Sequence, residues 1–153
     1  MPVPALLISL LGLAPFILCG LAALGPNAGT ADPWLQALIG YAAVVLSFVG
    51  GVHWGLVLRE PEPPLKNARI GLAIVPLLLG WAALVAAVVV AYWLALLVLI
   101  AGYILAIAVE HQGSQRGLLP GRYLWLRWTF TIVAVAMLTT VVTLRLLGQT
   151  IAF

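Results

Sequence analysis

The longest apolar stretch of the chain, residues 68–109, reads ARIGLAIVPLLLGWAALVAAVVVAYWLALLVLIAGYILAIAV. It is 42 residues long and contains a single charged residue. A helix crosses the hydrocarbon core of a bilayer with about 20 apolar residues, so this stretch is long enough for two crossings. Tyr92 and Trp93 stand near its middle, and such aromatic residues gather at membrane interfaces. The stretch therefore predicts two membrane helices, at about 69–89 and 92–109.

The composition of the whole chain also indicates a membrane protein. Hydrophobic residues make up 65% of the 153 residues, charged residues only 7%, and the mean hydropathy is +1.21. A soluble domain carries about a quarter charged residues, which it needs to cover its surface. The chain is therefore predicted to lie in the lipid bilayer, and its length allows a single transmembrane domain, residues 1–153.

Three further segments are long and apolar enough to cross, at about 5–24, 34–58 and 123–147. Asp32 and Pro33 are interpreted as the start of the second of these helices. We expect the first to be a retained helix and not a signal peptide, because no Lys or Arg precedes its apolar core. The predicted fold is all-α, a polytopic membrane bundle of five transmembrane helices.

Two of these segments share a pattern. GLAPFILCGLAAL (12–24) and GLAIVPLLLGWAAL (71–84) each contain a proline followed by Gly-x-Ala-Ala-Leu. The pattern is compatible with a tandem repeat, here two helical hairpins plus one extra helix, as parallel repeats occur in some transporters, although such repeats normally show a cleaner signal. The alternative is a chance match between segments that are rich in Ala, Leu and Gly.

The basic residues predict the orientation of the five helices. One face would carry the N-terminus and six basic residues, against only Arg145 on the other face. The six are Arg59, Lys66, Arg69, Arg116, Arg122 and Arg127. Because Lys and Arg accumulate on the cytoplasmic side of membranes, we expect the N-terminus in the cytoplasm and the C-terminus outside.

Several function classes are disfavoured by the sequence. The formal charge is +3, but the basic residues are scattered at predicted membrane edges, so we expect no binding of nucleic acid. Cys19 is the single cysteine, which excludes a disulfide or a C-x-x-C zinc site within the chain. No H-E-x-x-H, G-x-S-x-G or glycine-rich phosphate loop is present. The sequence predicts no catalytic residues and no metal site.

The stretch SFVGGVHWGLVLRE (47–60) is unusually polar and glycine-rich for a membrane helix. Ser47, Gly51 and Gly55 recur every four residues, which places them on one helix face. Small residues at this spacing let two helices approach closely in lipid. We therefore expect a helix-packing role for these three residues, within the chain or, as the alternative, in a homodimer.

His53 faces away from that stripe, about 9 Å inside the predicted cytoplasmic boundary. Glu110 should lie at a similar depth, and so should Arg127, with Thr131 one helical turn further on. The predicted candidate site is a cytoplasm-facing polar layer of His53, Trp54, Glu110, Arg127 and Thr131. The alternative is an interface belt in which these groups meet carbonyls and phosphates.

Two cofactors stay open at this stage, although the sequence predicts none. His53 and His111 lie on different helices at the same membrane side and could bind a haem between them. Pro15 and Pro76 can free backbone carbonyls inside helices, which is compatible with a quinone site near the polar layer. We therefore retain haem and quinone only as alternatives to a chain without cofactor.

Three motifs carry a resemblance to a known family. They are YAAVVLSFVGGVHWGL (41–56), PLLLGW (76–81) and LPGRYLWLRWTFT (119–131). The chain resembles an uncharacterised family of small multi-pass proteins of bacterial inner membranes, with a mitochondrial relative designated only as a numbered transmembrane protein. The most specific part, LSF-x-GG-x-HWG, contains His53 and Trp54, and the last motif contains Arg127 and Thr131. Asp is more usual in the family where this chain has Glu110.

The resemblance implies a helical bundle in a bacterial inner membrane and no established activity. From small size, short loops and glycine faces, we expect a non-catalytic accessory or assembly subunit of a larger membrane complex, with a respiratory complex as one candidate. Its partners would be the lipid bilayer and other membrane subunits, or a second copy of the chain. The alternative is a small carrier or channel, or a quinone- or lipid-binding protein, using the polar layer.

Overall fold

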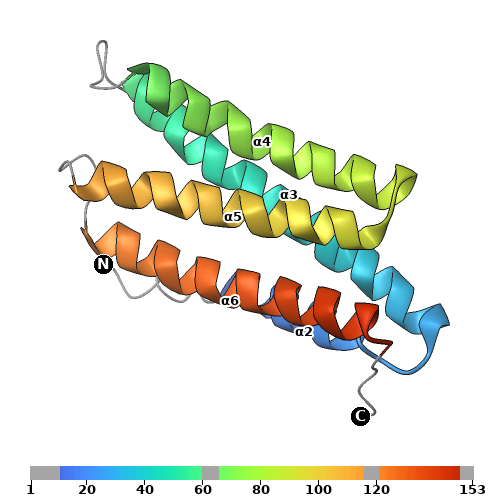
Figure 1. Ribbon diagram of the computed structural model, residues 1–153. Helices are drawn as coiled ribbons and strands as arrows, with labels where there is room; N and C mark the ends of the chain where they lie inside the picture. Colours follow the sequence, from blue (N-terminus) through green and yellow to red (C-terminus); the bar gives the residue numbers. More distant parts are fainter. Residues whose placement is uncertain (1–10, 60–65, 116–120, 149–153) are drawn as a thin grey trace.

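The computed structural model describes residues 11–59, 66–115 and 121–148. These residues form an all-α fold of five helices: α2 (Ala14–Ala22), α3 (Ala28–Arg59), α4 (Lys66–Val89), α5 (Tyr92–Gln115) and α6 (Gly121–Leu146). In Figure 1, α4, α5 and α6 lie side by side, α3 runs obliquely behind α5, and α2 lies beside α6. The central helix is α3, which packs against α2, α4 and α5.

The prediction of five transmembrane helices is wrong in number. Among the described residues, three helical stretches are long and apolar enough to cross a membrane: Ala28–Gly55, Tyr92–Gln112 and Leu124–Leu146. Among the described residues, α4 contributes a shorter apolar stretch, Ala73–Val89. Helix α2 has nine residues, about 14 Å of helix, and the first part of the predicted segment 5–24 lies outside the described residues.

The arrangement of two tandem hairpins plus one helix is wrong as well. The nine-residue α2 is too short to mirror the 24-residue α4, although both contain a proline. The most extensive contact is between α3 and α4, whereas a repeat would pair α2 with α3 and α4 with α5 as equivalent hairpins. The similarity between 12–24 and 71–84 is therefore one of composition.

Helix α3 begins earlier than the sequence suggests. The Asn27 side chain accepts a hydrogen bond from the backbone N–H of Gly29 at 3.0 Å, and the Thr30 hydroxyl donates to the Asn27 carbonyl at 3.0 Å. Asparagine is a favoured residue at this position, because its oxygen satisfies an N–H that the first helical turn leaves open. Pro33, expected at the start of the helix, consequently lies inside it.

The core is centred on aromatic rings. Phe16 of α2 makes edge-to-face contacts with Tyr41, Tyr103 and Phe130, with ring centroids 5.2, 6.1 and 5.7 Å apart. The Tyr103 hydroxyl donates to the carbonyl of Ala42 at 2.9 Å, so this buried polar group is satisfied. One phenylalanine thus contacts α3, α5 and α6 together.

The close approach of α3 and α4 depends on a glycine. A Cβ added at Gly80 would lie 2.8 Å from the Ala43 carbonyl oxygen and 2.8 Å from the Ser47 hydroxyl. The first of these atoms belongs to the backbone and cannot rotate away. Gly80 therefore allows a separation between the two helices that a side chain would prevent.

Candidate functional site

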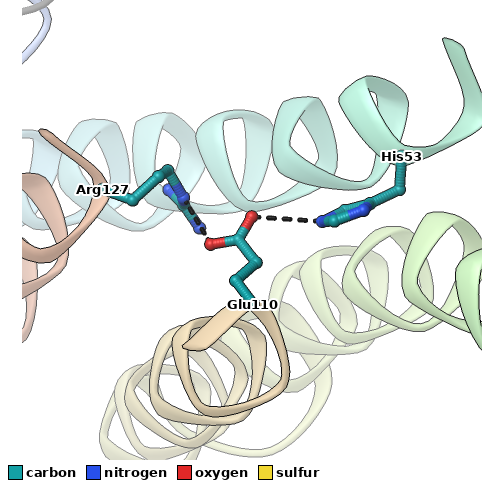
Figure 2. A network of polar contacts seen from close by, with 3 residues as sticks. All are labelled: His53, Glu110 and Arg127. Carbon is teal, nitrogen blue, oxygen red and sulfur yellow. Dashed lines mark hydrogen bonds and ion pairs between the residues drawn. The ribbon is translucent and has the colours of Figure 1, made fainter. Parts of the chain in front are cut away.

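Three helices bring one charged residue or histidine each to the same point. Glu110 of α5 accepts a hydrogen bond from Arg127 Nε of α6 at 2.8 Å through Oε2, and its Oε1 lies 3.1 Å from His53 Nε2 of α3. Figure 2 shows the Glu110 carboxylate between the other two side chains. An ionised carboxylate only accepts hydrogen bonds, so His53 Nε2 carries the proton that it donates.

This network is removed from solvent. Glu110 is 0% exposed, and His53 and Arg127 are also buried. A buried carboxylate is strongly disfavoured unless a positive charge and hydrogen bonds compensate for the water it has lost. The Arg127 guanidinium supplies both, and His53 adds a second hydrogen bond. The three side chains therefore depend on one another.

Two polar atoms beside the network have no hydrogen-bond partner among the described residues. They are Arg127 Nη2 and Thr131 Oγ1, both buried. The two residues are four positions apart on α6, so their side chains share a helix face. Buried donors of this kind normally bind a protein group, a water or a ligand. An oxygen atom placed here could accept from both.

Trp54 does not join the network. The Trp54 side chain is half exposed, whereas His53, the residue before it on α3, is buried. Trp34 and Trp54 are both half exposed and lie 20 residues apart on α3, a separation of about 30 Å. This matches the thickness of the hydrocarbon core, and tryptophan gathers at both of its boundaries. Trp54 is next to His53 in the chain, so one of these tryptophans lies at the end of α3 that carries the network.

The residues predicted for helix packing occupy different surroundings. Ser47 donates to the Ala43 carbonyl at 2.8 Å, and its hydroxyl oxygen lies on the α4 side of α3, at Gly80. Gly51 and Gly55 are exposed, and no described atom lies within 4 Å of a Cβ added to either. A packing role for these two glycines stays a prediction, and it requires a partner outside the described chain.

His111 lies apart from the three-residue network. Its ring packs edge-to-face on Trp128, with centroids 5.9 Å apart, and its Nε2 lies 3.1 Å from Gln115 Nε2. His53 Nε2 is directed at Glu110 instead. In the described ranges, no three His, Cys, Asp or Glu side chains come together as a metal-binding group. The two histidines are thus engaged in separate contacts.

With this geometry established, the chain can be compared with known proteins. The model of a family described as proteins of unknown function, DUF3429, matches residues 1–143. The chain belongs to the DUF3429 family. The resemblance found in the sequence motifs is confirmed, and no solved structure matches the chain.

Two relatives of this DUF3429 member are both designated transmembrane protein 69. The protein from Xenopus tropicalis is 39% identical over 85 residues, which cover 54% of this chain and 33% of the relative. The protein from Mus musculus is 36% identical over 97 residues, covering 54% of this chain and 34% of the relative. The chain thus matches about a third of the length of these curated relatives. Together the family and these relatives identify a small multi-helix membrane protein.

A second polar cluster, not predicted from the sequence, lies at the opposite end of the bundle. Arg145 of α6 donates through Nη2 to Asp32 Oδ1 of α3 at 2.5 Å, and its guanidinium carbon lies 5.4 Å from the Tyr92 ring centroid. Asp32 had been interpreted only as a helix start. The available signal was that Asp32 and Arg145 are the two charged residues that the predicted topology assigns to this side of the membrane, with opposite signs.

The buried network generates a prediction about stability. Replacing Glu110 by Leu leaves the Arg127 charge buried without its carboxylate, and Arg127→Leu leaves the carboxylate without its cation. Each change is expected to lower the free energy of unfolding by about 3 kcal/mol, since breaking a buried pair strands a charge. The double variant Glu110→Leu/Arg127→Leu should lose less than the sum of the two. Denaturant unfolding of the purified chain in detergent micelles measures all three.

Arg145→Leu is the matched control, because its partner Asp32 is largely exposed to solvent. Its loss is expected to be smaller than that of either network variant. Strictly additive losses in the double variant would contradict the mutual dependence of Glu110 and Arg127.

Proposed function

We propose that the chain is an accessory or assembly subunit of a larger membrane complex, with a respiratory complex as one candidate, and carries out no catalysis of its own. The observation that carries the proposal is an exposed face of α3 formed by Val44, Phe48, Gly51, Gly55 and Leu58. We call it the outer face of α3. Positions 44, 48, 51, 55 and 58 follow helical spacing, so they form one continuous stripe.

The two glycines of this face have a cost in helix stability that no contact with the described residues offsets. A glycine inside a helix is less favourable than alanine by about 1 kcal/mol. Gly80 offsets this through close contact with α3, and Gly20 and Gly102 also lie against neighbouring side chains. Gly40, Gly51, Gly55 and Gly71 make no such contact with described residues, and of these Gly51 and Gly55 are the exposed ones. A helix of another subunit packed on this face would supply it.

The polar network supports a structural role for the opposite side of the same helix. His53 is two residues beyond Gly51 and points into the bundle, where it reaches Glu110. The network therefore fixes the rotation of α3 about its axis relative to α5 and α6. With the rotation fixed, the outer face of α3 is presented to a partner in one orientation.

Replacing Gly51 by Leu tests the proposal. The Leu side chain meets open space in the isolated chain, so the thermal unfolding temperature in detergent should be little changed. The same side chain would block close approach of a partner helix. In mild-detergent purification from native membranes, the wild-type chain is expected to co-migrate with a stoichiometric membrane-protein partner. The Gly51→Leu variant should lose that partner.

Gly71→Leu is the matched control, since Gly71 is also a helical glycine with no described atom within 4 Å of an added Cβ. It lies on α4 and should retain the partner. Retention of the partner by Gly51→Leu, or a wild-type chain that purifies alone, would contradict the docking role of the outer face.

We further propose that the His53–Glu110–Arg127 end of the bundle faces the cytoplasm of a bacterium, in its inner membrane, with the N-terminus on the same side. The support is the excess of six basic residues over one that the sequence assigns to this end. Alkaline phosphatase fused after residue 153 should be active outside the cytoplasm, and the same enzyme inserted at 116–120 should be inactive. The reverse pattern would reject this orientation.

A second candidate function is a quinone site, favoured by the open donors Arg127 Nη2 and Thr131 Oγ1. Glu110 and Arg127 carry opposite charges and already pair, so the remaining donors suit a neutral acceptor. A quinone carbonyl oxygen has this character. The site would lie near the boundary of the hydrocarbon core, where an apolar ring and tail can enter from lipid.

This second candidate is tested by extracting bound small molecules from the purified chain. The wild-type chain should release a quinone in near-stoichiometric amount, measured by absorbance and mass spectrometry. Thr131→Val removes one hydrogen bond and should lower the occupancy, with binding about fivefold weaker. Thr140→Val is the control, because Thr140 is exposed and bonds to the Ala136 carbonyl. A wild-type extract without quinone would reject the candidate.

A further inference from the structure

The Asp32–Arg145–Tyr92 cluster has unused binding capacity. A guanidinium carries five N–H donors, and the hydrogen bond to Asp32 Oδ1 uses one of them. The Tyr92 ring lies over the guanidinium at 5.4 Å and restrains it without consuming a donor. Arg145 is therefore held in place, and within the described part of the chain most of its donors have no acceptor.

The bond between Arg145 and Asp32 is one that another anion can replace. The Asp32 side chain is 58% exposed, whereas that of Arg145 is only 17% exposed. An exposed ion pair contributes between 0 and about 1 kcal/mol, because water solvates the separated carboxylate well. If a second anion takes the guanidinium, Asp32 can return to water at little cost, but Arg145 requires a replacement.

Two cavities open on either side of this arginine. One, of about 280 Å³, is lined by the apolar side chains of Leu35, Ile39 and Ala87 together with Asp32, Gln36, Tyr92 and Arg145. The other, of about 220 Å³, lies between Arg145 and the α2–α3 connection. An apolar groove that ends at a fixed guanidinium matches a ligand with a hydrocarbon part and an anionic head.

The tryptophans beside the Asp32–Arg145–Tyr92 cluster indicate which kind of anion would reach Arg145. Trp34 follows Asp32 by two residues on α3, and Trp93 follows Tyr92 on α5; both side chains are partly exposed. Tryptophan at this level marks the membrane–water interface. Phosphate groups of lipids lie at the same level, and arginine binds phosphate oxygens with paired N–H donors.

We propose that Arg145 and the groove of Leu35, Ile39 and Ala87 form a binding site for an anionic phospholipid. The phosphate accepts hydrogen bonds from the guanidinium, one acyl chain enters the groove, and Asp32 competes with the phosphate for Arg145. The inference is independent of the proposed subunit function, since it concerns the opposite end of the bundle from the His53–Glu110–Arg127 network. A free phosphate ion shares the headgroup chemistry but has no part that would occupy the groove.

The competition by Asp32 gives the proposal a distinctive signature. Removing the arginine should weaken binding, while removing the carboxylate that competes with the lipid should strengthen it. Asp32→Asn keeps the size of the side chain and lies at an exposed position, so the fold should tolerate it. Lipid binding is thus expected to weaken when Arg145 is replaced and to strengthen when Asp32 is replaced. If the ion pair were purely structural, both replacements would change lipid binding in the same direction.

The test uses the full chain reconstituted in phosphatidylcholine vesicles that contain increasing fractions of phosphatidylglycerol with brominated acyl chains. Bromine quenches tryptophan fluorescence at short range, and Trp34 and Trp93 lie next to the proposed site. Brominated phosphatidylglycerol should quench the wild-type chain at lower mole fraction than brominated phosphatidylcholine does. Arg145→Gln should shift the half-quenching fraction about tenfold upward, and Asp32→Asn about threefold downward. The variant Trp34→Phe/Trp93→Phe should lose the headgroup-dependent part of the signal.

Two further arms identify the source of the phosphate. Ala87→Phe fills the groove and should reduce binding of the lipid, and added inorganic phosphate should fail to displace the lipid. Displacement by inorganic phosphate together with an unaffected Ala87→Phe variant would overturn the lipid assignment. Equal quenching of wild-type and Arg145→Gln chains would overturn the site. If Arg145→Gln does not fold, an Asp32→Asn chain that binds no more tightly than wild type overturns it instead.

Discussion

The buried carboxylate of Glu110 is the interaction on which the arrangement of the helices depends. It cannot stay ionised in an apolar bundle without a cation and hydrogen-bond donors, and these come from two other helices. Because side-chain hydrogen bonds tolerate only small displacements, α3, α5 and α6 have one permitted register and rotation at this end. The apolar contacts elsewhere are less directional, so they stabilise the bundle without selecting this arrangement alone.

The polar groups divide into two layers with an apolar middle between them. One layer holds His53, Glu110 and Arg127, and the other holds Asp32, Tyr92 and Arg145. Between them the core consists of aliphatic side chains and a few aromatic rings whose hydroxyls are internally bonded. The separation of Trp34 and Trp54 by about 30 Å of helix gives this middle region the thickness of a hydrocarbon core. Charge is least costly near the boundaries of a membrane, and the two layers lie at opposite ends of the helices.

The sequence predicted the all-helical character and the membrane environment because both follow from composition and apolar length. It also placed His53, Glu110 and Arg127 at one depth, since depth can be counted along a helix. It overestimated the number of crossings: among the described residues α2 has nine residues and the apolar stretch of α4 is limited to Ala73–Val89. The Asp32–Arg145 contact joins residues 113 positions apart, and only the packing of α3 on its neighbours brings them together.

The three residues of the Glu110 network are synthesised in a fixed order. His53 is synthesised first, Glu110 follows 57 residues later, and Arg127 a further 17 residues later. When α5 enters the membrane, His53 is therefore the one of the two partners already present to receive the carboxylate. The arginine arrives with the next helix and completes the pairing. Of the two partners of the carboxylate, the histidine is thus the one that precedes it in the chain.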